Sequence, residues 1–237
     1  MQMILSRRLI SLLTILILLL PRLNGANPLS TAGTGIVDTT CNDQVINNGK
    51  LWINKFASAE NSQFLFTDKF LFSSINILGK RYEGFSIKYD IYADELITIS
   101  CDGSLIQLNR EMVDSFSFNF EGKVYKFTNL SCDSIAGLKG FVNMLYSGKS
   151  KLCIKNIKEL YHMDGQTVNP KFFQKNRVYL VLENRAWPLK GKKSLLQVMC
   201  DKENELKEFI SVNRIKVSKY DPETCIPVIR FYDSLKK

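Results

Sequence analysis

The chain has 237 residues, 45% of them hydrophobic, and a formal net charge of +9. Three of its 32 basic residues and none of its 23 acidic residues lie in positions 1–26, so the remaining 211 residues carry a net charge of +6 and suffice for one sizeable core or two small ones. That charge is modest and spread along the chain, whereas nucleic-acid-binding proteins gather basic residues on one face, so nucleic acid is not expected as a partner.

Residues 1–26 have the pattern of a secretory signal peptide. Two arginines precede an apolar run at residues 9–20, and the small residues Gly25 and Ala26 follow it. A charged start, a short apolar run and a small-residue exit are the three parts of such a signal. The run is shorter than the roughly 20 residues that a membrane-spanning helix needs. We therefore expect an exported chain, periplasmic or extracellular, with no transmembrane segment once the signal is removed.

The next part of the chain predicts a leader and then strands. Residues 27–50 are rich in Asn, Thr, Gly and Asp, and we expect a flexible leader at 27–63. From residue 64 to 127 apolar and polar residues alternate, as in the series Phe85, Ile87 and Tyr89, which is typical of strands with one buried face. Turn signals separate these runs at 79–80, 93–95, 101–104 and 121–123. The pattern predicts an antiparallel meander of five or six strands, either a curled sheet or a small open barrel.

The rest of the β-rich body, which we place at 64–190, mixes signals. Helical spacing of apolar residues predicts one short helix at 138–145. Strands are expected again at 151–160 and 177–183. The polar stretch 161–173 between them is expected to be a long surface loop.

Residues 191–237 predict a helical C-terminal segment. Asp201 is expected to cap a helix, and Thr224 is expected to cap the last one, which places Pro227 in its first turn, where proline is tolerated. The expected buried residues are Leu195, Leu196, Met199, Leu206, Phe209, Ile210, Ile226, Ile229, Tyr232 and Leu235. The predicted fold class is therefore α+β, an antiparallel β meander with a helical C-terminal segment packed on it.

Six cysteines follow the expected signal: Cys41, Cys101, Cys132, Cys153, Cys200 and Cys225. An oxidising compartment permits disulfides, and six cysteines allow fifteen pairings, which the sequence leaves open. No two are spaced C-x-x-C, which argues against a zinc ribbon and a thioredoxin-like redox site. Cys153 and Cys225 have apolar neighbours and are expected to be buried.

The densest group of carboxylates is Asp90, Asp94 and Glu95. Two carboxylates can perform general acid–base catalysis or cleave a glycosidic bond, and they can bind calcium, although the EF-hand pattern is absent. Because the three lie at the end of a strand and in its turn, we favour turn-forming and solvating roles. They remain the one alternative catalytic site; no cofactor-binding or metal-binding residue is expected.

Other candidate motifs are weaker. His162, the only histidine, lies in an expected loop without a metal-binding or triad pattern, so a surface histidine is favoured. The triplet at 148–150 resembles the end of a phosphate-binding loop, but Asn143 stands where the first glycine is required. Trp52 and Trp187 can stack on sugars if exposed, although core packing is favoured.

Several short segments carry a resemblance to a known group of proteins. They read GKRYEG at 79–84, YDIYADE at 89–95, LYSGK at 145–149, KENELKEFI at 202–210 and FYDSL at 231–235. In these segments and in its signal, the chain resembles uncharacterised exported proteins of Bacteroidota-type Gram-negative bacteria. The resemblance implies a periplasmic or outer-surface location, a β-rich body and a helical C-terminus. It implies no activity and no functional residue.

Together these observations predict an exported soluble protein that acts as a non-enzymatic binding or structural module of the cell envelope. The expected partner is another envelope protein or a glycan, and the oligomeric state stays open. The alternative is a carboxylate-dependent hydrolase of envelope glycans, which would use the Asp90–Glu95 turn. A basic surface that docks on anionic membrane is a third hypothesis.

Overall fold

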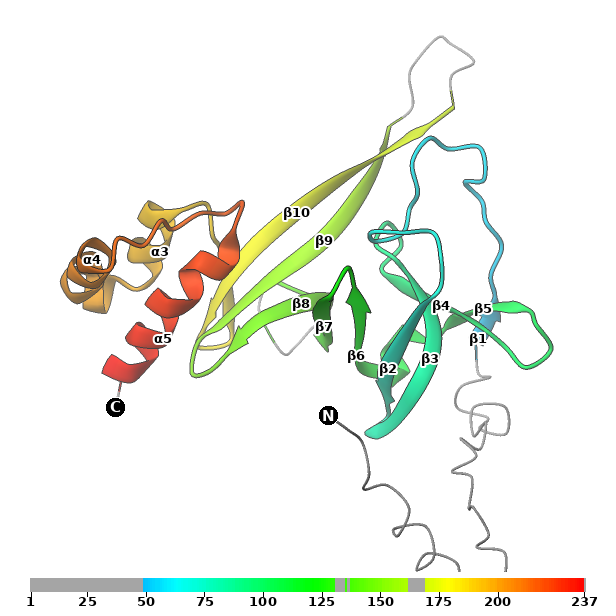
Figure 1. Ribbon diagram of the computed structural model, residues 1–237, viewed down its shortest axis with the longest axis horizontal. Coiled ribbons are helices and arrows are strands. Elements are labelled where there is room, and N and C mark those ends of the chain that lie inside the picture. The colour runs from blue at the N-terminus through cyan, green and yellow to red at the C-terminus, as the bar shows by residue number, and fades with distance from the viewer. Residues whose placement is uncertain (1–48, 131–134, 136, 162–168, 237) are drawn as a thin grey trace, which may run out of the picture. The chain divides into compact units, whose positions relative to one another are not determined.

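The computed structural model describes residues 49–130, 135, 137–161 and 169–236. Within them, eleven strands form one antiparallel sheet in the order β1-β5-β4-β3-β2-β6-β7-β8-β9-β10-β11 (Figure 1). The sheet is open, with β1 and β11 at its edges. The first strands are β1 (Gly49–Leu51), β2 (Leu71–Ile77), β3 (Lys80–Asp90), β4 (Glu95–Ile99), β5 (Leu105–Leu108) and β6 (Val113–Phe120). The others are β7 (Lys123–Leu130), β8 (Gly140–Ser147), β9 (Lys151–Tyr161), β10 (Lys171–Leu182) and β11 (Arg185–Pro188).

The expected β-rich, antiparallel body is confirmed, but the strands do not follow one another in a single meander. β6 pairs with β2 instead of β5, so the chain returns to the free side of β2 through the short 3-10 helix η1 (Arg110–Met112). The amide of Leu78 donates to the carbonyl oxygen of Met112 at 3.0 Å and helps to hold this return. The chain therefore builds two ladders, β2–β5 and β6–β11, that meet at β2 and β6.

Alternation along the strands matches burial. In β3 the aromatic and aliphatic side chains of Phe85, Ile87 and Tyr89 are buried, and Tyr89 makes edge-to-face contacts with the rings of Phe116 and Phe127. The expected turns lie between strands. Successive strands thus place large apolar residues on one face, where they form an aromatic-rich core.

The leader prediction is wrong at its C-terminal end. Gly49–Leu51 form β1, which pairs with β5, and the Trp52 amide continues the pairing with a 2.8 Å hydrogen bond to the Leu105 carbonyl oxygen. Residues 27–48 lie outside the described residues. β1 matters below because it closes one side of the candidate site.

The helix predicted at 138–145 is wrong, because most of this segment belongs to strand β8 (Gly140–Ser147). Its first four residues are all buried: Phe141 belongs to the aromatic core and Val142 to a second apolar cluster. A strand covered on both faces carries apolar residues continuously. Its apolar spacing can then match a helix as well as a strand.

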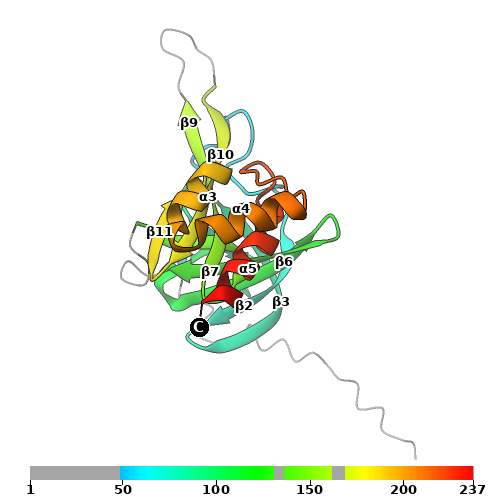
Figure 2. The same cartoon turned by 90° about the vertical axis from the view of Figure 1, so that its left-hand side faces the viewer.

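The strand predicted at 151–160 is confirmed as β9, whereas β10 starts well before the predicted residue 177. Phe172 and Phe173, which we expected in a loop, are paired with Leu160 and Glu159 of β9. β9 and β10 form a hairpin that extends past the other strands (Figures 1 and 2). Residues 162–168, which include His162, lie outside the described part of the chain.

The C-terminal segment is helical, as predicted. It contains α3 (Lys192–Val198), η2 (Cys200–Lys202), α4 (Glu203–Val212), η3 (Pro222–Cys225) and α5 (Ile226–Leu235). The three α-helices gather near the end of β10 that leads to β11 (Figures 1 and 2). Of the expected inward residues, Leu195, Leu196, Met199, Leu206, Ile210, Ile229 and Tyr232 are buried, and Phe209, Ile226 and Leu235 are half-buried.

Both predicted helix caps are wrong by one residue. Lys202 precedes α4, and Asp201 instead accepts a 2.8 Å hydrogen bond from the Tyr232 hydroxyl. Cys225 caps α5 because the η3 turn comes first. Pro227 lies in the first turn of α5, as expected.

The cysteines divide into two kinds. Cys101 is disulfide-bonded, whereas Cys153, Cys200 and Cys225 are free. Cys41 and Cys132 lie outside the described residues. Cys153 and Cys225 are buried, as predicted, and burial raises the pKa of the Cys153 thiol to about 12. Cys200 is exposed.

Candidate functional site

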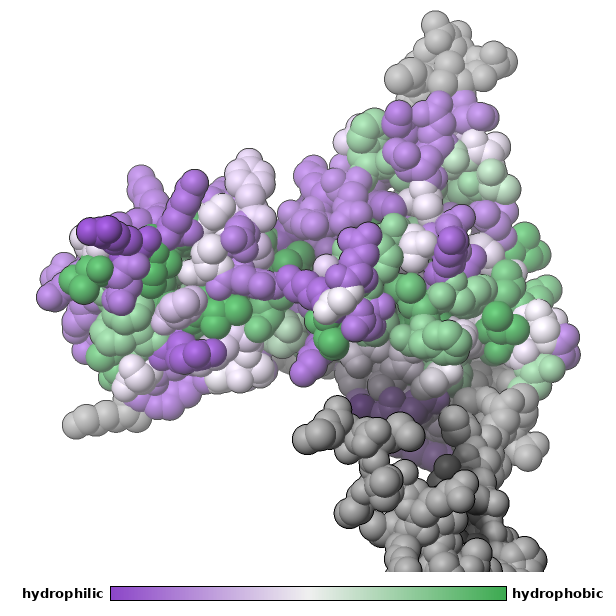
Figure 3. Space-filling model, in the orientation of Figure 1, coloured by the Kyte–Doolittle hydropathy of each residue, from purple (hydrophilic) through white to green (hydrophobic). Residues whose placement is uncertain are grey.

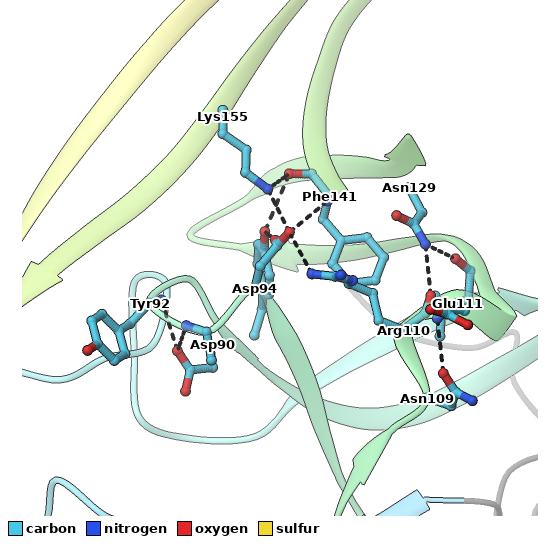
Figure 4. Close-up of polar contacts among 12 residues, drawn as sticks. Asp90, Tyr92, Asp94, Asn109, Arg110, Glu111, Asn129, Phe141 and Lys155 are labelled. Carbon is cyan, nitrogen blue, oxygen red and sulfur yellow. Dashed lines mark hydrogen bonds and ion pairs between the residues drawn. The ribbon is translucent and has the colours of Figure 1, made fainter. Parts of the chain in front are cut away.

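Asp90 ends β3, Asp94 lies in the turn that follows, and Glu95 begins β4, and each has a different environment. Figure 4 shows the first two. Asp90 is buried, with 2% of its surface exposed. Its Oδ1 accepts hydrogen bonds from the amides of Tyr92 and Ala93, each at 2.9 Å, and its Oδ2 accepts one from Gln63 Nε2 at 2.9 Å. Burial raises the pKa of Asp90, and these hydrogen bonds oppose that rise. Asp90 therefore stabilises the turn.

Asp94 lies at the centre of a polar cluster that joins four elements (Figure 4). Its Oδ2 lies 2.8 Å from Nζ of Lys155, which belongs to β9. The same oxygen lies 3.7 Å from a guanidinium nitrogen of Arg110, which belongs to the 3-10 helix η1. The Tyr89 hydroxyl donates to its Oδ1 at 2.7 Å, and the Phe141 amide donates to Oδ2 at 3.3 Å. With so many partners, Asp94 acts as a structural anchor.

Lys155 and Gly140 complete that cluster. Burial lowers the pKa of Lys155, and the charge of Asp94 opposes this effect. Lys155 Nζ also donates to the Phe141 carbonyl oxygen at 3.0 Å. Gly140 has φ +76°, and a Cβ at this position would collide with Oδ2 of Asp94. A glycine is therefore needed for the ion pair to form.

Glu95 differs from the other two carboxylates. It is half-buried, and within the described residues its carboxylate forms no hydrogen bond or ion pair. Burial raises its pKa, and the nearby charge of Asp90 adds to this effect, while Arg110 and Lys50 oppose it. Glu95 is thus the carboxylate of the three that remains available to a ligand.

Glu95 lines two adjoining pockets of about 480 and 460 Å³, which also share Lys50 and Gln107. We name the two together the β1–β5 cleft. Lys50 of β1 is paired with Gln107 of β5, and Gln107 with Ile97 of β4. Since paired residues share a face and side chains alternate along a strand, Glu95 lies on the same face as Lys50 and Gln107.

The two pockets of the cleft differ in character. The first is polar and includes Asn109, Arg110 and Glu111. Here Asn109 Oδ1 accepts a 3.2 Å hydrogen bond from the Glu111 amide and thereby caps η1 (Figure 4). The second includes the rings of Trp52, Phe56 and Tyr92. The cleft therefore offers charged and amide groups at one end and aromatic surfaces at the other.

The structure brings together only part of the predicted site. Asp90 and Glu95 line the same pocket, but Asp94 points into its own cluster with Lys155. Sequence reasoning considered Trp52 but missed Lys50, Gln107 and Arg110. Arg110 lines the polar pocket from η1, whereas Lys50 and Gln107 meet in the cleft through the pairing of β1 with β5. No motif signals that pairing. Trp187, the other tryptophan considered, is half-buried, and the Arg185 guanidinium stacks on its ring at 4.3 Å.

Neither a metal centre nor a membrane-spanning helix is found in the part of the chain that the structure describes. Its His, Cys, Asp and Glu side chains form no group of three or more arranged to hold a metal ion. None of its helices has the length and apolar character needed to cross a membrane.

Comparison of the chain with protein-family models, with curated proteins and with solved structures finds no match.

Proposed function

We propose that the protein is an exported, non-enzymatic binding module of the cell envelope, and that it binds a glycan in the β1–β5 cleft. The observation that carries the proposal is the Glu95 carboxylate, which forms no hydrogen bond or ion pair among the described residues and lies between a polar pocket and an aromatic one. A sugar presents apolar C–H faces together with hydroxyl groups, so it requires aromatic surfaces and hydrogen-bonding side chains in the same cleft.

Two observations support export. The pattern of residues 1–26 is that of a secretory signal. Cys101 is disulfide-bonded, and structural disulfides belong to oxidising compartments such as the periplasm or the cell exterior. A location in the envelope would place the cleft where glycans are abundant.

We favour binding over hydrolysis because glycoside hydrolysis requires two carboxylates with separate roles. Both oxygens of Asp90 accept hydrogen bonds, from its own turn and from Gln63, and Asp94 is paired with Lys155. Hydrolysis nevertheless has one observation in its favour, because Glu95 shares the polar pocket with Glu111. A carboxyl group with a raised pKa, such as that of Glu95, suits a general acid. Hydrolysis is therefore the alternative that the experiment must separate from binding.

We also propose that the helical segment packs on β8–β10 so that both form a single unit. One cluster of buried side chains contains Leu152 and Leu180 from the strands together with Leu195, Leu206 and Ile229 from the helices. Asp233 of α5 accepts hydrogen bonds from the amide and hydroxyl of Ser150, which follows the turn after β8. This contact gives the Gly148-Lys149-Ser150 triplet a structural role in place of phosphate binding.

The experiment measures retention of the purified chain, from residue 27 onward, by peptidoglycan sacculi and by soluble envelope polysaccharides. Tyr92→Ala is expected to weaken binding about tenfold by removing an aromatic wall. Tyr220→Ala, a change at an exposed tyrosine outside the cleft, serves as the matched control and is expected to bind as the unaltered chain does. The proposal would be overturned if no sacculus or polysaccharide retained the protein, or if the two variants bound equally well. Shortening of a polysaccharide that is lost in Glu95→Gln would replace it by the hydrolase.

A further inference from the structure

Strand β10 has a stretch of edge in its middle that no described residue pairs with. Residues Phe173–Arg177 are five consecutive exposed positions, and β11 pairs only with the later part of β10, from Tyr179 onward. Nearer the start of β10, the Phe172 amide donates to the Glu60 carbonyl oxygen at 3.0 Å, and Asn61 Nδ2 donates to the Phe172 carbonyl oxygen at 3.2 Å. Among the residues that the structure describes, the edge is thus covered at both ends of this stretch and open between them.

The hydrogen-bond pattern shows which backbone groups face the open edge. The Val178 carbonyl oxygen accepts from the Leu189 amide at 2.8 Å, so Val178 directs its backbone groups away from β9. Because these directions alternate along a strand, Gln174 and Asn176 also direct their N–H and C=O groups away from β9. On β9, the Lys158 amide donates to the Ile91 carbonyl oxygen, away from its partner Gln174, which agrees with this assignment.

Two of the five side chains in this stretch, Lys175 and Arg177, are basic. Phe173, Lys175 and Arg177 alternate with Gln174 and Asn176, so the two cations lie on the same face. Among the described residues, Lys175 forms an exposed ion pair with Glu159 at 3.3 Å, and Arg177 forms none. Figure 3 shows a hydrophilic surface along the β9–β10 hairpin.

We propose that this stretch of β10, residues Phe173–Arg177, is a docking site for an extended acidic segment of a partner protein, which adds to the sheet as a short strand. The backbone groups of Gln174 and Asn176 would supply hydrogen bonds, and Lys175 and Arg177 would select acidic side chains. Lysines on an edge ordinarily repel unwanted strands. Here they exclude apolar and basic strands and leave an acidic strand as the complementary one.

A second copy of this chain is a poorer occupant. Antiparallel pairing of two such stretches about Lys175 would place the two Lys175 side chains opposite each other and bring each Phe173 opposite an Arg177. Like charges that oppose each other across a ladder are destabilising. The site is also separate from the β1–β5 cleft, so its failure and that of the glycan proposal are distinguishable.

The test uses the chain from residue 27 onward and fluorescein-labelled peptides in which Glu or Lys alternates with Thr and Val. Fluorescence anisotropy is expected to show saturable binding of the Glu peptide and none of the Lys peptide. Replacing Lys175 and Arg177 together by Glu is expected to weaken binding of the Glu peptide about tenfold or more and to favour the Lys peptide.

The substitution Asn176→Pro tests the backbone contact. Proline lacks the backbone N–H that Asn176 directs at the open edge, so the substitution leaves the pairing of β10 with β9 intact. Thermal unfolding of the variant checks that the fold is retained. Asn176→Pro is expected to abolish binding of the Glu peptide, whereas Asn176→Ala, which keeps the N–H, is expected to bind within about twofold of the original. Methylation of alternate backbone nitrogens of the Glu peptide should abolish binding as well. This second test uses the unaltered protein, so it does not require a variant to fold.

Three results would overturn the proposal. The first is equal binding of the Glu and Lys peptides, and the second is binding that survives both Asn176→Pro and peptide methylation. The third is absence of saturation by the Glu peptide up to about 1 mM, which corresponds to only about 4 kcal/mol of binding free energy. A dimer in sedimentation equilibrium that Asn176→Pro dissociates would assign the edge to a second copy of the chain instead.

Discussion

Gly140 determines whether Asp94 and Lys155 can meet. Its φ of +76° is in the region that favours glycine, and the space that a Cβ would occupy is taken by Oδ2 of Asp94. The two residues are far apart in the sequence, so no local pattern reveals that position 140 must lack a side chain. The ion pair that results fixes the β3–β4 turn against β8 and β9.

We expect Gly140→Ala to destabilise the fold more than a glycine substitution at a similar φ elsewhere. A Cβ at Gly122, which has φ +78°, would meet no heavy atom within 4 Å, so Gly122→Ala measures the backbone strain alone, about 1–2 kcal/mol. Gly140→Ala should add about 1–3 kcal/mol for the collision with Asp94. Urea unfolding of both variants provides the comparison, and equal losses would contradict this role for Gly140.

Glu95 gives a pH dependence with a definite sign. Its pKa in the folded chain is raised above the ordinary value of 4.5, chiefly by burial, so its contribution to stability is present below that value and is lost as the pH rises through the folded-state pKa. Glu95→Gln resembles the protonated form at every pH. We expect the variant to match the unaltered chain near pH 4 and to be the more stable of the two at pH 7. Thermal unfolding across this range would contradict the argument if the difference were constant.

At the scale of elements, sequence patterns predicted the secondary structure correctly wherever one face of an element is buried and the other is exposed to solvent. β3 and the buried stripes of α3 and α4 are of this kind. The prediction for β8 failed because its first four residues are buried on both faces, so the period of two disappears there. The first half of β10 failed for the opposite reason, since Phe173–Arg177 are all exposed and the ladder with β9 specifies the strand without an apolar pattern.

The contact between α5 and the β8–β9 turn could not be predicted from the periodicity of apolar residues either. Asp233 is buried on a helix face, where it accepts from the Ser150 amide at 3.0 Å, from the Ser150 hydroxyl at 2.5 Å and from the Tyr146 hydroxyl at 3.0 Å. A Cβ at Gly148 would collide with the Tyr146 hydroxyl and lie 2.5 Å from Oδ2 of Asp233. These three donors explain why an aspartate, and not an apolar residue, occupies the buried position 233.

Removing the acid should therefore be costly. We expect Asp233→Ala to lower the free energy of unfolding by about 2–4 kcal/mol, because buried donors lose their acceptor. Tyr146→Phe removes one donor and should cost about 1 kcal/mol. Ser234→Ala changes the exposed neighbour on the same helix and should alter stability by less than about 0.5 kcal/mol. If urea unfolding showed Asp233→Ala and Ser234→Ala to be alike, the proposed attachment of α5 through this contact would be wrong.

At the scale of the whole molecule, the fold class and the antiparallel strands followed from the sequence, but the order of strands did not. The return of β6 to β2 and the pairing of β1 with β5 are contacts between distant segments. The candidate site inherits this difficulty. The turn at Asp90–Glu95 could be named from its local cluster of acids, whereas Lys50 and Gln107 join Glu95 only once β1 has paired.

The final prediction concerns export of the protein from the cytosol. If residues 1–26 direct export, the chain produced in a Gram-negative host should be recovered from the periplasm without them, and its disulfide should be formed there. We expect the Cys101 thiol of this product to resist alkylation until a reductant is added, while the exposed, free Cys200 reacts at once and serves as an internal control. A chain that begins at residue 27 and stays in the cytosol should react at both positions. Mass spectrometry of the peptides measures all of this. Recovery of intact Met1, or a reactive Cys101 in the exported product, would remove the basis for placing the protein in the envelope.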